Sequence, residues 1–246
     1  MALFGLIKDK LEPINIGGIL KADMHSHFIP GIDDGAKTIN DSLLLIRSME
    51  ELGYEKVITT PHIMSDSYKN TPEIILGGLE KVREAVAKAG MKIKVEAAAE
   101  YYLDYDFESK LKSKNMLTFG QNYLLFEMAF VNPPDNLYGF VFEMQMQGYK
   151  PVMAHVERYG FWQNDYSKYE EFVSRGIILQ MNINSLTGHY SNETKKAAHW
   201  LIDHDLISLV GSDCHHPGHI ELIKRTLTDK YLHKLLSSKR LLNATL

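Results

Sequence analysis

Short apolar runs alternate with longer amphipathic stretches along this 246-residue chain, and this alternation restricts the fold more than any other feature. The runs are four to seven residues long, and several are rich in β-branched residues, as buried parallel strands are. They cover residues 19–24, 56–60, 93–98, 123–127, 151–154, 177–183 and 207–210. Seven strands that alternate with helices predict a parallel α/β sheet, either closed into a barrel or open and doubly wound.

The amphipathic stretches carry helix start and stop signals. The predicted helix over residues 42–52 follows a capping box that begins at Thr38. The predicted helix over residues 72–89 follows Thr71 as its N-cap and ends at Gly90. Further helices are predicted over residues 136–147, 166–175 and 193–204.

Length and composition predict one soluble domain that spans residues 1–246. The formal net charge is −4, and no basic block of the kind that binds nucleic acid is present. No apolar run approaches the ~20 residues that a membrane span needs, so we expect no membrane insertion. The apolar stretch within the first 13 residues is too short for a signal peptide. The chain has one cysteine, Cys214. We therefore expect a cytoplasmic protein without an internal disulfide.

Side chains that bind metals follow six of the seven predicted strands. They are His25 and His27, His62, Glu100, Glu127, His155, and the pair Asp213 and His215. The sixth strand ends instead in amides, at Asn182 and Asn184. In a parallel barrel these strand ends meet at one mouth, where barrel enzymes build their active sites. Burying so many ionisable groups together without cations would leave uncompensated charge, so the pattern predicts a metal centre.

The chemistry of the candidate ligands indicates the kind of centre. His25 and His27 point to the same side of an extended strand because side-chain direction has a period of two. A mixed set of imidazoles and carboxylates without an obvious thiolate favours Mn, Fe or Zn, and eight candidates indicate two or three ions. Such a centre suits the hydrolysis of a phosphate ester by a metal-bound hydroxide.

At this point the motifs resemble a known family. Residues 23–37 read DMHSHFIPGIDDGAK, and TTPH (59–62), AEYY (99–102), HVERY (155–159) and GSDCH (211–215) follow in order. The set resembles the protein-tyrosine phosphatases of the polymerase and histidinol phosphatase (PHP) superfamily, in the CpsB/CapC group of bacterial capsule and exopolysaccharide loci. The resemblance implies a distorted (β/α)7 barrel with three metal ions, usually manganese or iron.

The resemblance also assigns residues to roles. It implies three ligand sets: His25, His27, Glu100 and Asp213; Glu100, Glu127 and His155; and Asp34, His62 and His215. The family pattern favours Asp34 over Asp33, which the sequence itself cannot separate. It further implies that Arg158, Asp34 and His62 are catalytic.

Phosphate binding is the point at which the chain departs from the pattern. Arg158 matches the family arginine that holds the phosphate, and its guanidinium fork suits that group. Many relatives carry a second arginine after the last Asp-x-His motif, whereas this chain has none before Arg225. We therefore expect Arg158, His216 and His219 to bind the substrate.

Two other features have competing interpretations. Cys214 invites comparison with cysteine phosphatases, but these need an arginine six positions on, where this chain has Ile220. Alternation along the strand should also turn Cys214 away from the mouth. Aromatic residues follow several strand ends, and they either pack the loops or form an apolar rim that receives a phenyl ring: Tyr101, Tyr102, Tyr105, Phe130, Tyr159, Phe161 and Trp162.

The resemblance favours a phosphotyrosine-protein phosphatase that acts on the tyrosine-rich tail of a bacterial tyrosine kinase. One alternative is a small-molecule phosphatase of the same fold, such as histidinol phosphatase. Another is a non-catalytic regulator that binds phosphotyrosine without turnover. The lack of a basic groove disfavours a nuclease. The sequence leaves open whether copies of the chain form a homo-oligomer.

Overall fold

The computed structural model describes residues 11–163, 165–238 and 240–246 of the chain. The first ten residues, which carry most of the expectation that no signal peptide is present, lie outside these ranges. Among the described residues, no helix combines the length and the apolar character that crossing a membrane requires.

Every predicted apolar run contributes strand residues, and two of the runs lead past a break into a second short strand. The strands are β1 (Ala22–Asp23), β2 (Lys56–Thr59), β3 (His62–Ile63), β4 (Lys94–Ala97), β5 (Glu100–Tyr102), β6 (Tyr123–Glu127), β7 (Lys150–Met153), β8 (Ile178–Asn182) and β9 (Ile207–Gly211). Pro61 lies in the break between β2 and β3, where a residue without an N–H cannot continue the ladder. Ala98 and Ala99 form the break between β4 and β5.

The strands form one distorted barrel from two parallel ladders. One ladder has the order β1-β2-β4 and the other β3-β5-β6-β7-β8-β9. Of the two broken strands, the first pairs with β1 through β2, and the second pairs with β6 through β5, so the breaks shift the sheet from one ladder to the other. The segments after β1 and β9 then meet in a parallel bridge between Ser26 and Cys214, which closes the ring. The predicted seven-stranded α/β barrel is confirmed.

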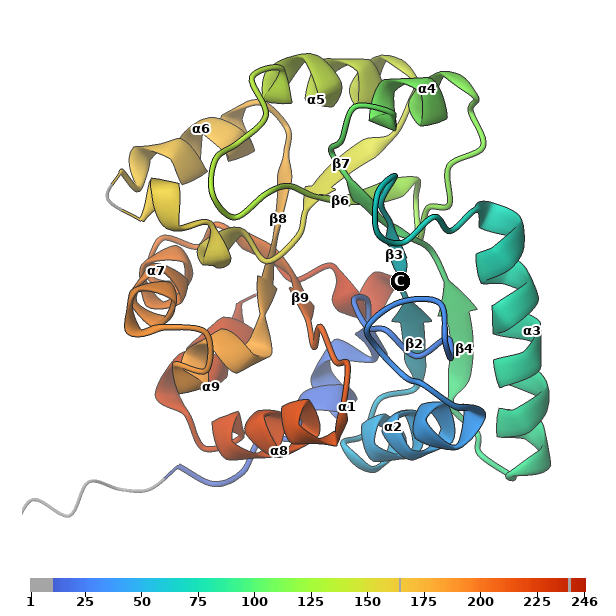
Figure 1. Cartoon of the computed structure of the whole chain (residues 1–246). Coiled ribbons are helices and arrows are strands. Elements are labelled where there is room, and N and C mark those ends of the chain that lie inside the picture. Colours follow the sequence, from blue (N-terminus) through green and yellow to red (C-terminus); the bar gives the residue numbers. More distant parts are fainter. Residues whose placement is uncertain (1–10, 164, 239) are drawn as a thin grey trace, which may run out of the picture.

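Most of the helices surround the strands as an outer ring, and the short helix nearest the N-terminus lies inside that ring (Figure 1). The helices are α1 (Ile16–Leu20), α2 (Ile39–Glu51), α3 (Pro72–Lys88), α4 (Phe107–Lys112), α5 (Leu137–Met146), α6 (Ser167–Ser174), α7 (Asn192–Asp203), α8 (Pro217–Thr226) and α9 (Lys230–Ser237), with short 3₁₀ turns at Val156–Arg158, Gly160–Trp162, Ile183–Thr187 and Asn243–Thr245. The capping box at Thr38 is present, and Thr71 caps α3 through the N–H of Ile74. Gly90 follows α3 with φ of +69°, as expected for a residue after a helix end.

The first predicted strand was too long at its N-terminal end. Residues 19 and 20 belong to α1, and β1 begins at Ala22. The Asn15 side chain caps this helix by accepting the N–H of Gly18 at 2.9 Å. Gly17 lies directly against the backbone of Gly53 and Tyr54, where any side chain would collide. A helical turn capped by asparagine and packed through a glycine therefore replaces the start of the strand.

A packed apolar core fills the barrel below its mouth. The core includes Ile58 of β2, Leu125 of β6, Val152 of β7 and Leu209 of β9, and Leu246 packs against it. Because these strands stand around the ring, the cluster that they share lies inside it. The polar strand ends therefore rest on a solid apolar base.

Candidate metal centre and active site

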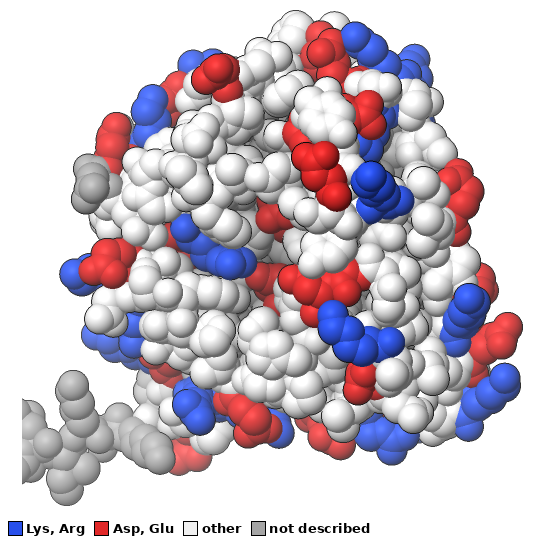
Figure 2. Space-filling view, viewed as in Figure 1, with Lys and Arg blue, Asp and Glu red and all other residues white. Residues whose placement is uncertain are grey.

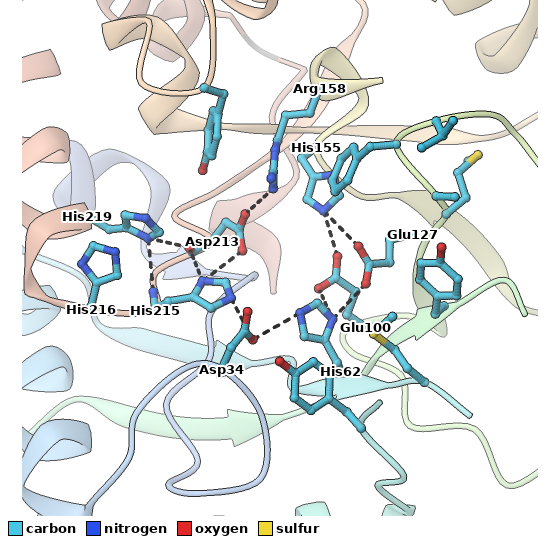
Figure 3. A pocket seen from close by; sticks show the side chains of 18 residues that line it. Asp34, His62, Glu100, Glu127, His155, Arg158, Asp213, His215, His216 and His219 are labelled. Atoms are coloured by element: carbon cyan, nitrogen blue, oxygen red, sulfur yellow. Dashed lines mark hydrogen bonds and ion pairs between the residues drawn. The ribbon is translucent and has the colours of Figure 1, made fainter. Parts of the chain in front are cut away.

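The polar residues predicted at the strand ends come together in one cavity of about 720 Å³. Figure 2 shows the hollow near the centre of the face, with acidic side chains at its floor and rim. Figure 3 shows how the side chains from different strands point toward one another. The cavity is lined by Asp34, His62, Glu100, Glu127, His155, Arg158, Asp213, His215, His216 and His219, among others. His25 and His27 lie beneath it, fully buried.

The first group of potential ligands joins the ends of β1 and β9. The Nε2 atoms of His25 and His27 lie 3.5 Å and 3.4 Å from Oδ1 of Asp213. Nε2 of His25 also lies 3.1 Å from Oε2 of Glu100. The structure therefore brings together the four residues that the family resemblance groups around one ion.

The second group centres on Glu100, which faces several rings at once. Its Oε1 atom lies 3.0 Å from Nε2 of His155, and its Oε2 atom lies 3.2 Å from Nδ1 of His62. Glu127 approaches the same two rings, at 3.7 Å from His155 Nε2 and 2.9 Å from His62 Nδ1. His62 thus stands between the second and third implied ligand sets, a position that the sequence motifs do not indicate.

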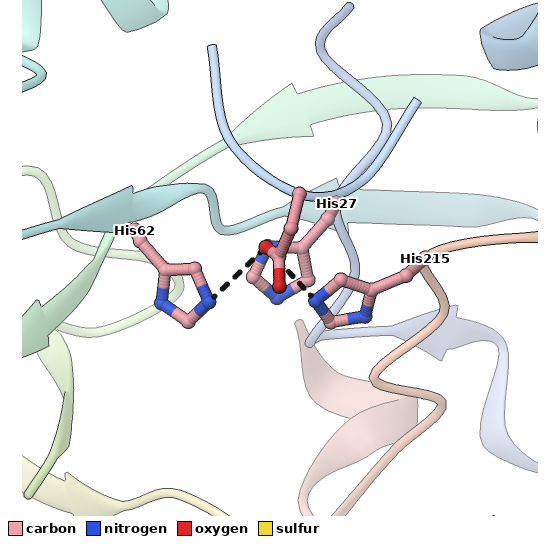
Figure 4. A group of neighbouring side chains, drawn as sticks. His27, His62 and His215 are labelled. Atoms are coloured by element: carbon pink, nitrogen blue, oxygen red, sulfur yellow. Dashed lines mark ion pairs between the residues drawn. The ribbon is translucent and has the colours of Figure 1, made fainter. Parts of the chain in front are cut away.

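The third group lies at the outer side of the cavity (Figure 4). Oδ1 of Asp34 lies 3.6 Å from Nε2 of His62 and 3.4 Å from Nε2 of His215. His27 belongs to the same group. Asp33 instead turns inward, where its carboxylate pairs with Nδ1 of His27 at 2.8 Å. Of the two neighbouring aspartates, Asp34 faces the cavity and Asp33 supports a ring from behind.

The pKa shifts of these groups show that the buried carboxylates depend on nearby positive charge. Burial alone would raise the pKa of Glu100, but His25 and His62 hold it well below its usual value. Burial alone would lower the pKa of His27, but Asp33 and Asp213 raise it well above its usual value. Ionised carboxylates at this depth need a counter-charge, which either protonated rings or cations can supply.

Several ring nitrogens lack a hydrogen-bond partner, so their lone pairs are available to bind cations. Nε2 of His27 and Nδ1 of His62 are buried and make no hydrogen bond, although both face carboxylate oxygens within 4 Å. Lone pairs and carboxylates that converge in this way match the donor set of a divalent transition metal. The residues therefore fit a centre with more than one metal ion.

The backbone is strained at two of these positions. His155 has φ of +33° and Asp213 has φ of +48°, both in the left-handed region that residues other than glycine rarely adopt. Each lies two residues past a strand end, and the turn aims the side chain into the cluster. Such strain is typical of functional sites.

Arg158 lines the cavity beside Asp213. Its Nη1 atom donates to Oδ2 of Asp213 at 3.0 Å. The guanidinium lies 4.6 Å from the centre of the Phe130 ring and 4.2 Å from that of Tyr190, so the two rings hold it between them. Tyr190 was not among the predicted site residues, and its place in the loop before α7 gives no signal in the sequence.

The two predicted substrate histidines also line the cavity. The rings of His216 and His219 lie 4.1 Å apart, His216 exposed and His219 buried. Nδ1 of His219 lies 3.3 Å from the N–H of His215. Burial and the neighbouring His216 lower the pKa of His219 to about 4, so this ring is neutral at pH 7.

Apolar and aromatic side chains line the cavity next to the polar cluster, and we call them the apolar wall. It consists of Met64, Tyr68, Tyr102, Met128, Phe130 and Val131. Of the aromatic residues that were expected to form either a rim or loop packing, Tyr102 and Phe130 line the cavity. Tyr101, Tyr159 and Trp162 pack in the core, and Tyr105 lies exposed outside it. The Tyr68 ring, which sequence reasoning missed, stacks on His62 at 5.4 Å.

Cys214 lies away from the cavity, as the strand alternation predicts. Its side chain is fully buried in the main apolar core. Burial raises the pKa of its thiol well above the usual value, so no thiolate is available there.

Comparisons with known proteins agree with this geometry. Residues 21–238 match the family model described as "Capsular polysaccharide synthesis, CpsB/CapC". Tyrosine-protein phosphatase YwqE of Bacillus subtilis is 28% identical over 194 residues, which cover 78% of this chain and 76% of YwqE. Tyrosine-protein phosphatase CpsB of Streptococcus agalactiae is 27% identical over 199 residues, which cover 78% of this chain and 82% of CpsB.

Solved structures give the same result. A chain from the crystal structures of YwqE from Bacillus subtilis and CpsB from Streptococcus pneumoniae, described as unique metal-dependent tyrosine phosphatases, superimposes with a TM-score of 0.80 and 26% identity. The match covers 89% of this chain and 88% of that one. A lactonase from Listeria monocytogenes, with a TM-score of 0.54 and 10% identity, shares the fold alone.

Proposed function

This chain belongs to the CpsB/CapC family, and from that premise we propose that it is a metal-dependent phosphatase that hydrolyses phosphotyrosine in a protein. The family that the sequence motifs predict is thereby confirmed. The observation that carries the proposal is the mixed lining of the cavity, in which an apolar wall adjoins a cluster of imidazoles and carboxylates. The cluster suits a phosphoryl group, and the wall suits the phenyl ring to which it is attached.

We propose that the centre holds two or three divalent ions, with manganese favoured and iron or zinc as alternatives. The ligands would be His25, His27, Asp34, His62, Glu100, Glu127, His155, Asp213 and His215. When bound, such ions supply an activated water near neutral pH and offset negative charge on the phosphoryl oxygens. The chain's own part is to hold the donors together on a rigid base and to exclude thiol chemistry.

Arg158, His216 and His219 are proposed to bind the phosphoryl group. Arg158 keeps guanidinium N–H groups beyond the one that pairs with Asp213, and its planar fork suits phosphate oxygens. The rings of Phe130 and Tyr190 restrict its orientation before substrate arrives. Asp34 and His62 stand at the same mouth, and we propose that they act on the substrate as well as on the ions.

A protein substrate is favoured over a metabolite. The phenyl ring of phosphotyrosine can pack against Tyr102, Phe130 and Val131, and Val131 is 84% exposed at the rim, where a polypeptide can pass. Histidinol phosphate has no polypeptide that would pass over this exposed rim. We propose that the substrate is the tyrosine-rich tail of a bacterial tyrosine kinase, reached in the cytoplasm, and that the chain acts as one domain.

The test is a comparison of substrates on one preparation. With bound metal measured, kcat/KM is determined for a phosphotyrosine peptide, the matching phosphoserine peptide and histidinol phosphate. The proposal predicts clear preference for the phosphotyrosine peptide. Preference for histidinol phosphate would indicate the small-molecule alternative, and binding without turnover would indicate a regulator.

A variant pair locates the preference in the wall. Phe130→Ala should lower kcat/KM for the phosphotyrosine peptide by about tenfold, the scale of one lost aromatic contact. Phe142→Ala is the matched control, because Phe142 is exposed on α5 and lines no part of the cavity. Equal kcat/KM values for the two variants would show that the apolar wall does not contribute to recognition of phosphotyrosine.

A further inference from the structure

β8 brings no imidazole or carboxylate to the cavity, yet two of its side chains reach the centre. Gln180 and Asn182 are both fully buried. They lie two positions apart, so they point to the same side of the strand. Neither lines the open cavity, and each contacts a potential metal ligand, His25 or Asp213.

A backbone donor fixes the orientation of Gln180. The N–H of His155 donates to Oε1 of Gln180 at 2.8 Å, and a backbone N–H can only donate. The oxygen of this amide therefore occupies that position. Nδ1 of His25 lies 3.0 Å from the same oxygen, so Nδ1 must carry the proton. In the neutral ring this leaves the lone pair on Nε2, the atom that faces Glu100 and Asp213.

The orientation of the Gln180 amide in turn fixes that of the Asn182 amide. Nε2 of Gln180 donates to Oδ1 of Asn182 at 2.9 Å. The Nδ2 group of Asn182 consequently faces Asp213 and donates to its Oδ2 atom at 2.7 Å. With Oδ2 held, Oδ1 of Asp213 is the oxygen that faces the rings of His25 and His27.

Two further contacts show that this arrangement is built into the barrel. Gly211 of β9 leaves the space that the network needs, because a Cβ atom there would lie 2.8 Å from Nε2 of Gln180 and 2.6 Å from Cβ of His25. On the other side, the buried carboxylate of Glu157 accepts the backbone N–H of Asn182 at 2.9 Å. The two amides are therefore held by both of their flanking elements.

We propose that Gln180 and Asn182 are positioning residues of the metal centre. Gln180 holds His25 in the tautomer whose Nε2 can bind an ion, and Asn182 presents Oδ1 of Asp213 to the same place. Partners of this kind behind a ligand typically change metal affinity by about 10- to 100-fold. The inference rests on the proposed function only in requiring that the centre binds divalent ions.

The first test measures metal binding rather than turnover. Gln180→Leu should weaken Mn²⁺ binding by about 10- to 100-fold in competition with a chromophoric chelator. Met181→Ala is the matched control, because Met181 is the next residue of β8 and points into the main apolar core. It should lower the melting temperature and leave Mn²⁺ affinity unchanged. Equal Mn²⁺ affinity in Gln180→Leu and wild type would overturn the proposal.

A second variant separates the two amides and serves if Gln180→Leu does not fold. Asn182→Leu leaves the oxygen of Gln180 with His25 and His155. It removes the donation to Oδ2 of Asp213 and introduces no charge. Mn²⁺ affinity should fall, while His25 keeps its proton on Nδ1 in Zn²⁺-loaded, ¹⁵N-histidine-labelled protein.

The outcomes are distinct. In wild type, the proton of His25 on Nε2, or unchanged Mn²⁺ affinity in Asn182→Leu, would each refute the inference. If wild type bound neither Mn²⁺ nor Zn²⁺, the proposed function itself would fail. A wild type that binds metal but does not hydrolyse phosphotyrosine would leave the role of the two amides standing.

Discussion

Arg158 illustrates how much a single side chain depends on its surroundings. Its charge is shared with Asp213, and two aromatic rings fix its plane between them. A guanidinium held in this way can meet phosphoryl oxygens without first becoming ordered, and preorganised donors of this type stabilise charge that develops in a transition state. The ion pair also places Arg158 against a potential metal ligand, so metal content must be measured in each Arg158 variant.

Arg158→Ala should lower turnover of a phosphotyrosine peptide by roughly 100-fold, the scale of one lost preorganised donor. Arg158→Lys should restore only part of it, because a point charge cannot reproduce the two-pronged contact. Steady-state kinetics with metal content measured for each variant checks this.

Arg175→Ala is the matched control for Arg158→Ala. Arg175 also packs on a tyrosine, at 4.2 Å from the Tyr138 ring, but it lies outside the cavity. Its removal should leave turnover unchanged. If Arg158→Ala were as active as this control and His216→Ala were inactive, the phosphate would be bound by His216 instead.

Cys214→Ser should retain most of the turnover, because the thiol is buried in the core and faces away from the cavity. The hydroxyl should lower the melting temperature, since it brings a polar group into an apolar site. Turnover per bound metal ion, measured beside wild type, is the deciding quantity. A Cys214→Ser protein that is inactive with its metals in place would point to thiolate chemistry.

The sequence could predict most of the cluster residues, and the reason is local. Strand ends in a parallel barrel share one mouth, so a His, Asp or Glu at such an end is placed by topology alone. The sequence could not separate Asp33 from Asp34, because the conformation of the turn that carries them decides which one faces the cavity. It also could not find Tyr190 or Gln180, whose roles arise from contacts between segments far apart in the chain.

The closed barrel depends on the seam at which β1 and β9 meet. Near the mouth, the bridge between Ser26 and Cys214 joins the two sides. Near the base, the side chain of Asn243 replaces a strand pairing: it donates to the carbonyls of Ala22 and Val210 at 3.1 Å and 2.8 Å, and it accepts the N–H of Val210 at 3.0 Å. One buried amide therefore satisfies three backbone groups.

Asn243→Ala should lower the free energy of unfolding by about 3 kcal/mol, because buried backbone groups would lose their partners. Thr245→Ala is the control, since Thr245 lies in the same turn and is exposed. Chemical denaturation of both variants measures the difference. Equal stabilities would show that water replaces the amide at the seam.

Element boundaries followed from the sequence where local signals exist. The cap at Thr71 marked the start of α3 correctly, and the capping box at Thr38 is present, but α2 begins at Ile39 and not at residue 42 as predicted. The first strand began later than predicted, because the packing of Gly17 against a distant backbone favours a helical turn. The breaks after β2 and β4, and the seam closed by Asn243, depend on how strands pair and have no local signature.

At the scale of the whole molecule, the metal centre joins the two sides of that seam. His25 and His27 follow β1, and Asp213 and His215 follow β9, so an ion held between them would tie the ends of the barrel together. The formal net charge of the chain is only −4, yet four carboxylates of the cluster lie in one cavity: Asp34, Glu100, Glu127 and Asp213. Bound cations should therefore stabilise the entire fold as well as serve the reaction.

The most direct test of the central claim is turnover of a phosphotyrosine peptide before metal removal, after chelation and dialysis, and after reloading with Mn²⁺. Metal content and melting temperature are measured on the same samples. The account predicts that removal abolishes turnover and lowers the melting temperature, and that both return as Mn²⁺ binds. Undiminished hydrolysis of phosphotyrosine by protein from which the metal has been removed would contradict it.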